Sequence, residues 1–442
     1  MTGRENKKRP MRKLTVKNFS VIKRAELEFG KVTALIGPPS SGKSLLCKLA
    51  YFLGGEIIAV AVESLIGRSG WEEFLQSAVR EFNSRFSTEG WLRTNSTARF
   101  SSHDFSAEVF GAGDPPNPKT EIRFSGAFQE SYTTLKKNIS EQPAHMNAAL
   151  GELRQELWVK LSLVLNKTRT QANIFIPSGR AFFTDLGKSV SALQNPDMDQ
   201  ITRRFAGQIA WDTRWKVGLL TTGRDAVPGI EREMARIVGG VVIVSDGKPH
   251  FLSSDGRRLP LSLQSSGTQE LLPMFSVLNY LAYHQEHFYA RAAATKVSPL
   301  ADIIDHSFLV YLEEPEAHVF PGTQRELVRL FAWLANDKIL SFDWVITTHS
   351  PYILSSFNNL IEAGQAARKN PELHDQVAKI IPEQYWIKEG DFKAYAIENG
   401  ELRSILNESG FVEGNYLDQV SEVIGNEFDE LLRLEYEHTK AS

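Results

Sequence analysis

The chain has 442 residues, a formal net charge of −3, 42% hydrophobic and 23% charged side chains. These ordinary globular values exclude a fibrous repeat, a wholly disordered chain and a protein that is basic throughout. The single cysteine, Cys47, permits neither an intrachain disulfide nor a cysteine-rich zinc site, so we expect a reducing, cytoplasmic setting. The most apolar short run, Ile57–Val62, is too short to span a bilayer, and we expect no membrane contact.

The chain begins with a basic arm, residues 1–13, which carries six Lys/Arg and one Glu. A solvated tail and a phosphate-binding arm are both open interpretations of it. Because no apolar stretch of signal-peptide length follows, we do not expect a signal peptide. Residues 14–19 and 25–29 then alternate apolar and polar side chains, which predicts half-buried strands. Val32–Ile36 is nearly all apolar, as in a strand buried on both faces.

The segment GPPSSGKS, residues 37–44, matches the phosphate-binding pattern G-x-x-x-x-G-K-[ST] between this strand and a helix predicted over 43–53. Its glycines permit a tight turn, and successive N–H groups at the helix start attract phosphate oxygens. Pro38 and Pro39 have no N–H. The lysine is expected to reach the β- and γ-phosphates of ATP, and Ser44 to bind Mg²⁺. The residues predicted to bind the nucleotide here are Gly37, Ser40, Ser41, Gly42, Lys43, Ser44 and Leu45.

Residues 56–235 are predicted to form a mixed insertion. Apolar spacing over 56–86 and 130–170 indicates helices, and the alternation over 97–126, broken by GAGDPPNP, indicates a β-hairpin. Neither sustained heptads nor an internal repeat is present, so a coiled-coil arm is not expected.

A second set of α/β elements follows the insertion. Residues 241–262 predict a β-meander, and 268–294 a long helix. Buried strands are predicted over 308–312 and 343–347, with a helix over 324–336 between them. Strands that alternate with helices indicate a parallel α/β core.

Both of these buried strands end in residues with catalytic chemistry. Glu313 and Glu314 follow the first strand, at the end where open α/β sheets bind ligands. We expect Glu313 to be a Mg²⁺ ligand, usually an Asp in such pairs, and Glu314 to orient the attacking water. The second strand ends in VITTHSP, which contains His349.

The hexapeptide SSGTQE, residues 265–270, starts the long helix and resembles the signature motif of ABC-class ATPases. In that class the motif binds the γ-phosphate held by the opposite subunit. His349 resembles the ABC switch histidine, which contacts the γ-phosphate. The residues that the signature resemblance predicts to contact the nucleotide are Ser265, Ser266, Gly267 and Gln269.

With these four elements in this order, the sequence resembles the ABC-class ATPases that include the Rad50/SMC and OLD-like groups. EEPEAHVFP, residues 313–321, and SSGTQE resemble the OLD-like branch of prokaryotic anti-phage systems, which includes ATPase subunits of Septu, PARIS and some retron systems. IFIPSGR, residues 174–180, resembles a strand-then-Pro-x-x-Arg segment of that branch. This resemblance places Arg180 near the nucleotide.

The resemblance implies an α/β fold, an ABC-type P-loop ATPase head with a mixed α+β insertion between the Walker A helix and the signature motif. The core is expected over 11–55 and 236–360, the insertion over 56–235, and a C-terminal α/β segment with an acidic helix over 361–442. ATP and Mg²⁺ are then bound between two copies of the chain, and hydrolysis opens the dimer or higher oligomer.

The resemblance also implies a regulatory ATPase of a defence system whose effector, such as a nuclease, is a separate protein, since no Asp-x-Asp pair follows His349. The alternative is a DNA-maintenance clamp of the RecF or Rad50 kind, in which the basic arm and Arg203–Arg204 contact DNA phosphates. A transporter subunit ranks third because SSGTQE departs from the transporter form of the signature.

Overall fold

The computed structural model describes the residues in the following ranges: 11–88, 92–114, 118–141, 150–165, 170–185, 199–207, 209, 228–245, 248–295, 306–337, 341–414 and 426–433. Residues 1–10, which make up most of the predicted basic arm, lie outside these ranges. Within the predicted acidic helix of the C-terminal segment, residues 426–433 are helical.

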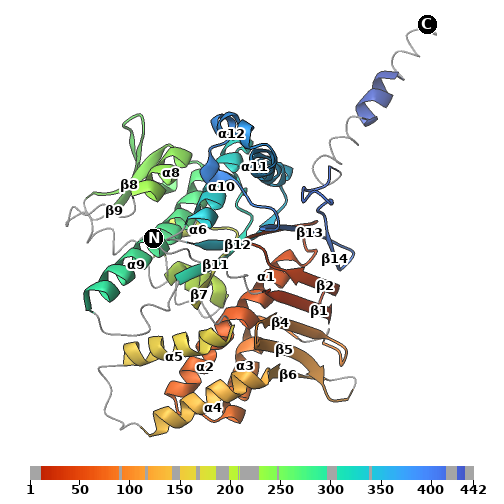
Figure 1. The fold of residues 1–442 in the computed structure, drawn as a ribbon, viewed down its shortest axis with the longest axis vertical. Coiled ribbons are helices and arrows are strands. Elements are labelled where there is room, and N and C mark those ends of the chain that lie inside the picture. Colours follow the sequence, from red (N-terminus) through yellow and green to blue (C-terminus); the bar gives the residue numbers. More distant parts are fainter. Residues whose placement is uncertain are drawn as a thin grey trace.

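An 11-stranded sheet forms the centre of the molecule, in the order β6-β5-β4-β1-β2-β14-β13-β3-β12-β11-β7 (Figure 1). A smaller sheet has the order β10-β9-β8. The strands of the central sheet are β1 Lys13–Phe19, β2 Ile22–Glu28, β3 Val32–Ile36, β4 Thr97–Ser102, β5 Phe105–Ala112, β6 Lys119–Phe124, β7 Thr170–Ile176, β11 His306–Glu313, β12 Phe342–Thr348, β13 Phe392–Glu398 and β14 Glu401–Ser404. Those of the smaller sheet are β8 Gly240–Ser245, β9 Lys248–Ser253 and β10 Arg258–Pro260.

Helices cover both faces of the central sheet. Figure 1 shows α2, α3, α4 and α5 on one side and α9, α10 and α11 on the other. The bounds are α1 Lys43–Tyr51, α2 Ile57–Ile66, α3 Trp71–Arg85, α4 Gly126–Ser140, α5 Leu150–Leu165, α6 Phe182–Asp185, α8 Pro228–Val238, α9 Ser266–Thr295, α10 Pro321–Asn336, α11 Pro351–Lys369 and α12 His374–Ile380. Single helical turns span Leu261–Leu263, Pro371–Leu373 and Glu383–Tyr385, and a π-helix, Phe52–Glu56, joins α1 to α2.

Two hydrophobic clusters form the core, one against each helical layer. The first joins α1 to α5 with β1, β2, β4 and β5, and the second joins α8 to α11 with β3, β11 and β12. Fully buried aromatic side chains such as Phe74 and Phe82 fill the first cluster, and Trp344 and Phe331 the second. Burial of each such side chain contributes about 1.5–3 kcal/mol. The predicted α/β architecture is confirmed.

The five strands β7, β11, β12, β3 and β13 run parallel to one another. In register, Val345 of β12 pairs with Tyr311 of β11 on one side and Thr33 of β3 on the other. Because parallel strands end at the same edge of a sheet, the segments that follow them gather there. This edge is therefore where the residues predicted for the P-loop, the acidic pair and the histidine come together.

The sheet crosses the predicted domain boundaries. Strands β4 to β7 come from the predicted insertion, and β13 comes from the predicted C-terminal segment, yet all of them belong to the central sheet. β13 pairs directly with the P-loop strand β3. The physical reason is that an open sheet accepts strands from distant parts of the chain wherever an edge or a gap remains. The core, the insertion and the C-terminal segment thus share one sheet.

The helical stretch from Lys43 to Ile66 is long and apolar enough to cross a membrane by length and composition alone. The expectation of no membrane span rested only on the shorter apolar run Ile57–Val62, which lies within this stretch. Most of it is buried inside the protein, as in the core helix of a soluble protein. It carries the P-loop at one end and the π-helix in its middle.

A buried ion cluster surrounds Glu56, the last residue of the π-helix. Glu56 Oε2 lies 2.8 Å from Arg85 Nε of α3, and Arg204 pairs with Oε1 of the same carboxylate. The Arg85 guanidinium also lies 5.1 Å from the ring centroid of Phe52. The cluster ties the helix that follows the P-loop to two parts of the predicted insertion. It also engages Arg204, which the DNA-clamp alternative assigned to phosphates.

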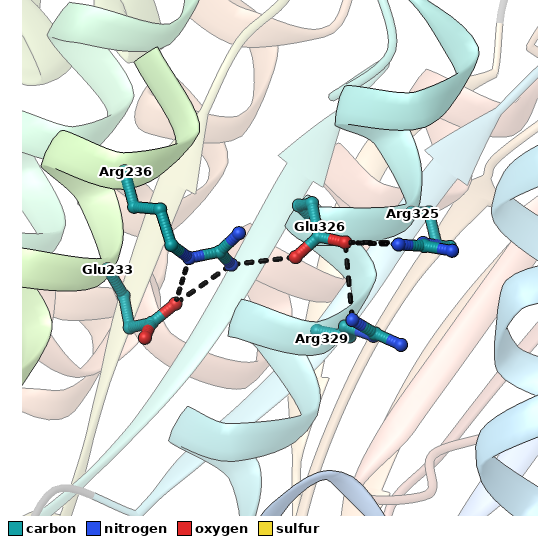
Figure 2. A network of polar contacts seen from close by, with 5 residues as sticks. All are labelled: Glu233, Arg236, Arg325, Glu326 and Arg329. Atoms are coloured by element: carbon teal, nitrogen blue, oxygen red, sulfur yellow. Dashed lines mark hydrogen bonds and ion pairs between the residues drawn. The ribbon is translucent and has the colours of Figure 1, made fainter. Parts of the chain in front are cut away.

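A second network fixes α8, which leads into the small sheet and the signature segment. Figure 2 shows Glu326 of α10 between Arg236 of α8 and the α10 residues Arg325 and Arg329. Arg236 Nη2 lies 2.6 Å from Glu326 Oε2 and 2.9 Å from Glu233 Oε2. Burial opposes ionisation of Glu326, but the hydrogen bonds from Arg236 and Arg325 lower its pKa. The carboxylate stays ionised and holds α8 against α10.

We expect Glu56→Ala to lower the free energy of unfolding by about 1–3 kcal/mol, because Arg85 and Arg204 lose their shared buried carboxylate. Arg85 keeps its ion pair with Glu81. The matched control is Glu63→Ala, whose carboxylate pairs with Arg154 at the surface and whose loss should leave stability unchanged. Urea unfolding followed by circular dichroism measures both. Equal stability of the two variants would contradict a structural role for the cluster.

Candidate active site

The P-loop turns sharply between β3 and α1. Gly42 is the N-cap of α1 with φ of 106°, and a Cβ there would lie 2.4 Å from Ile22 Cδ1. Ser40 also has a positive φ, 59°. The helix start has no side-chain cap, so its N–H groups point to a place where an anion is attracted. This is the geometry that the sequence predicted for phosphate binding.

Lys43 lies across the loop that carries it. Its Nζ donates hydrogen bonds to the carbonyl oxygens of Gly37, at 2.7 Å, and Pro38, at 2.9 Å. Burial lowers the pKa of Lys43, while the nearby Glu314 and Glu316 carboxylates oppose that shift. The Lys43 ammonium therefore interacts electrostatically with the acids that follow β11. The structure therefore brings the lysine of the P-loop and the acidic strand end together.

Glu313 is 5% exposed, and its Oε2 accepts a hydrogen bond from the Ser178 N–H at 3.3 Å. Its other oxygen, Oε1, is buried and has no hydrogen-bond partner among the described residues, and the same holds for Ser41 Oγ of the P-loop. Buried polar oxygens of this kind cost free energy unless a ligand binds them. A carboxylate and hydroxyls are the oxygen donors that Mg²⁺ prefers, so these residues, with the exposed Ser44 of the first turn of α1, fit the predicted metal and its nucleotide.

Glu314 adopts a strained backbone, with φ of 43°, which costs about 1–3 kcal/mol in a non-glycine residue. Its N–H donates to the Thr347 carbonyl at 2.9 Å. Its Oε1 lies 3.4 Å from His349 Nε2, and both side chains are about one third exposed, at 37% and 35%. The structure thus places the predicted water-orienting acid beside the predicted switch histidine, with both open to a ligand.

The signature segment begins α9. Ser265 and Ser266 are exposed, and Ser265 Oγ accepts a hydrogen bond from the Thr268 N–H at 3.3 Å. Gly267 packs on the turn that follows the acidic strand, since a Cβ there would lie 2.7 Å from the His318 carbonyl oxygen. The Gln269 amide instead braces the loop before it, through hydrogen bonds to the carbonyls of residues 262 and 264.

Arg180 lies beside the acidic strand end, close to the predicted nucleotide site, with its guanidinium on the backbone carbonyls of that strand end. Its side chain is fully buried, and Nη1 donates to the carbonyls of Pro177, at 2.8 Å, and Glu313, at 2.6 Å. Nη2 donates to the Glu314 carbonyl at 3.1 Å, and Nε lies 3.6 Å from Glu270 Oε2. With these partners the guanidinium positions the acidic strand end.

Two acidic residues near the site were not predicted. Glu270 is the last residue of SSGTQE and accepts the Arg180 N–H at 3.0 Å. Glu316 belongs to the EEPEAHVFP segment and contacts the end of β12. The available signal was their place inside segments already singled out, but a single glutamate has no sequence pattern that distinguishes a site residue from an ordinary polar one. Only the packing of β7, β11 and β12 shows that both lie against the site.

A family model described as an AAA ATPase domain matches residues 72–354. This is more than half of the chain. The protein belongs to the AAA ATPase domain family. The matched segment contains Arg180, the signature segment, the acidic pair and His349, and ATP hydrolysis is the general activity of this family. ATP binding by this family, with Mg²⁺ as its usual companion, agrees with the donors found at the site.

No curated protein matches the chain. Solved structures with a similar arrangement include the SMC head domain from Thermotoga maritima, with 13% identity, a TM-score of 0.38, and coverage of 91% of this chain and 100% of that one. Another is the SMC head bound to the winged-helix domain of ScpA, with 11% identity, a TM-score of 0.41, and 90% and 97% coverage. The Pyrococcus furiosus SMC head with the C-terminal domain of ScpA has 12% identity, a TM-score of 0.38, and 90% and 96% coverage.

The arrangement supports hydrolysis of a phosphoanhydride. Lys43 and the N–H groups of α1 would hold the phosphates, and Glu313 with Ser44 would hold Mg²⁺, which would neutralise phosphate charge. Glu314 would orient and polarise a water for attack, and His349 would contact the terminal phosphate. These roles differ because Lys43 follows β3, the acidic pair lies at the end of β11, and His349 follows β12.

We expect Glu314→Gln to bind ATP with nearly unchanged affinity and to lose at least about 100-fold in kcat, because the amide keeps the shape but cannot polarise water. Lys43→Ala is the contrasting variant, which should lose ATP binding since the phosphates lose their charge partner. Isothermal titration and a phosphate-release assay measure the two properties. Hydrolysis by Glu314→Gln at the wild-type rate would refute the assignment of Glu314.

Proposed function

We propose that the protein is an ATP-driven switch in which two copies close over shared nucleotides and hydrolysis reopens them. The observation that carries this proposal is the exposure of Ser265 and Ser266 at the start of α9. The Ser265 hydroxyl contacts Thr268 at the helix start, whereas the Ser266 hydroxyl makes no hydrogen bond among the described residues. Ser266 is therefore available to bind a phosphate held by a second copy. ATP then favours the closed pair through contacts that only that state makes.

Large exposed apolar side chains around the site support the same proposal. Leu263, two residues before the signature segment, is 69% exposed, and Phe320, at the start of α10, is 79% exposed. Tyr352, three residues after the switch histidine, is 54% exposed. Aromatic and aliphatic side chains of this kind anchor protein–protein interfaces. A second copy that covers the site would bury all three.

We further propose that this switch is the regulatory ATPase of a cytoplasmic anti-phage defence system and controls a separate effector, such as a nuclease or toxin. The support is the resemblance of EEPEAHVFP and SSGTQE to the OLD-like branch. An ATP-dependent change between closed and open pairs gives the chain a means to hold or release such a partner. Direct action on DNA, as in a maintenance clamp, is the competing outcome of the test below.

A mixing experiment tests the shared site. Ser266→Arg and Lys43→Ala are each expected to be inactive, but each keeps the half-site that the other lacks. Random pairing forms mixed dimers in about half of all dimers, each with one intact site, so about a quarter of the wild-type ATPase rate should return. Lys43→Ala mixed with Glu314→Gln is the control, since both changes fall in the same half-site. No recovery above this control would contradict the shared site.

The regulatory role is tested by capture of tagged Glu314→Gln protein from its native host, because the closed state is expected to retain its partners. The proposal predicts that a nuclease or toxin co-purifies with Glu314→Gln in stoichiometric amounts. The same protein should be absent when the Lys43→Ala variant is captured. Mass spectrometry and nucleic-acid staining identify what is bound. DNA without a protein partner would contradict the defence-switch proposal and favour the clamp.

A further inference from the structure

The Glu316 carboxylate joins the turn after β11 to the end of β12. Its Oε1 accepts a hydrogen bond from the backbone N–H of His349 at 2.6 Å and from the Thr348 hydroxyl at 2.8 Å. The Thr348 hydroxyl in turn accepts the Ser350 N–H at 3.0 Å. One carboxylate oxygen therefore orients three consecutive residues, of which the middle one is the switch histidine.

A second link runs in parallel with the first. Gln324 of α10 donates to the Val319 carbonyl at 2.8 Å and accepts from the Ser350 hydroxyl at 2.6 Å. Ser350 is also the N-cap of α11, where its Oγ accepts the Tyr352 N–H at 3.1 Å. The side chain of Gln324 is buried. The start of α11 is thus held against the turn after β11 from two directions.

Glu316 lies close to the candidate active site but does not take the role assigned to Glu314. Its charge raises the pKa of Lys43 and of Arg180, against the effect of burial. Its Oε2 is buried and has no hydrogen-bond partner among the described residues. A buried carboxylate costs free energy. The hydrogen bond from the His349 N–H accounts for a carboxylate at this position.

We propose that Glu316 is a positioning residue for ATP hydrolysis, which sets the place of His349 relative to Glu314 by accepting the His349 N–H. The inference rests on the proposed hydrolysis at this site. It requires an acceptor atom rather than a negative charge, because the two hydrogen bonds go to a single oxygen. Glu316→Gln keeps an acceptor at that position, whereas Glu316→Ala removes it.

Turnover and nucleotide binding separate this role from a direct one. In Glu316→Ala we expect kcat to fall by about 10–100-fold, the cost of a misplaced catalytic group, with the ATP affinity of the P-loop changed less than about threefold. Glu316→Gln should recover most of the rate. Glu121→Ala, an exposed carboxylate on β6, is the control and should match the wild type.

Amide hydrogen exchange of the nucleotide-free protein supplies a readout that does not need activity. Exchange in the segment that contains His349 and Ser350 should accelerate in Glu316→Ala and remain slow in Glu316→Gln. If the wild type shows no hydrolysis but exchange changes in this way, the proposed function fails and the positioning contact stands. Unchanged exchange and kcat in Glu316→Ala, or a Gln variant as impaired as the Ala variant, would overturn the inference.

Discussion

A single buried guanidinium holds the candidate active site together. Arg180 has no exposed surface, and it donates to the backbone carbonyls of Glu313 and Glu314 while its own N–H meets Glu270. A buried charge is tolerated only where hydrogen bonds replace water. The ends of β7 and β11 and the start of α9 therefore cannot move apart without exposing an unpaired charge. The acidic pair and the signature segment are bound to one point.

The second constraint is the set of hydrogen bonds that joins the end of β11 to the end of β12. Glu314 donates its N–H to the Thr347 carbonyl, and Glu316 accepts from Thr348 and His349. These contacts maintain the strained φ of Glu314, which isolated chain would not adopt. The backbones of Glu314 and His349 are therefore held by hydrogen bonds, while their side chains stay accessible to a ligand. The parallel register of the sheet brings Lys43 to the same edge.

Much of this arrangement is readable from the sequence, because apolar periodicity and motif spacing act locally. The buried strand Val32–Ile36 and the helix start at Lys43 have the predicted bounds, and the long helix of the signature segment begins two residues before its predicted start. The predicted site residues after β3, β11 and β12 do meet. Arg180 shows where local patterns stop, since a motif predicts proximity to a site but not whether a side chain faces the ligand or the backbone.

Other features depend on contacts between distant segments. β13 lies beside the P-loop strand, yet its sequence, FKAYAIE, resembles an ordinary half-buried strand and gives no sign of its neighbour. The π-helix forms where Glu56 meets Arg85 and Arg204, charges that lie up to 148 positions apart in the chain. Glu316 acquires its role only through the end of β12. Sequence patterns indicate which elements form, and packing decides which polar groups face one another.

The central claim is that the ends of β3, β11 and β12 form one site for ATP and a divalent cation. The most direct test is a crystal structure of Glu314→Gln with ATP and Mn²⁺, in which anomalous scattering locates the cation. The account predicts Mn²⁺ between the Ser44 hydroxyl and Glu313, with the terminal phosphate beside Lys43 and His349. Nucleotide bound away from the P-loop, or Mn²⁺ without contact to Glu313 through a ligand or water, would contradict it.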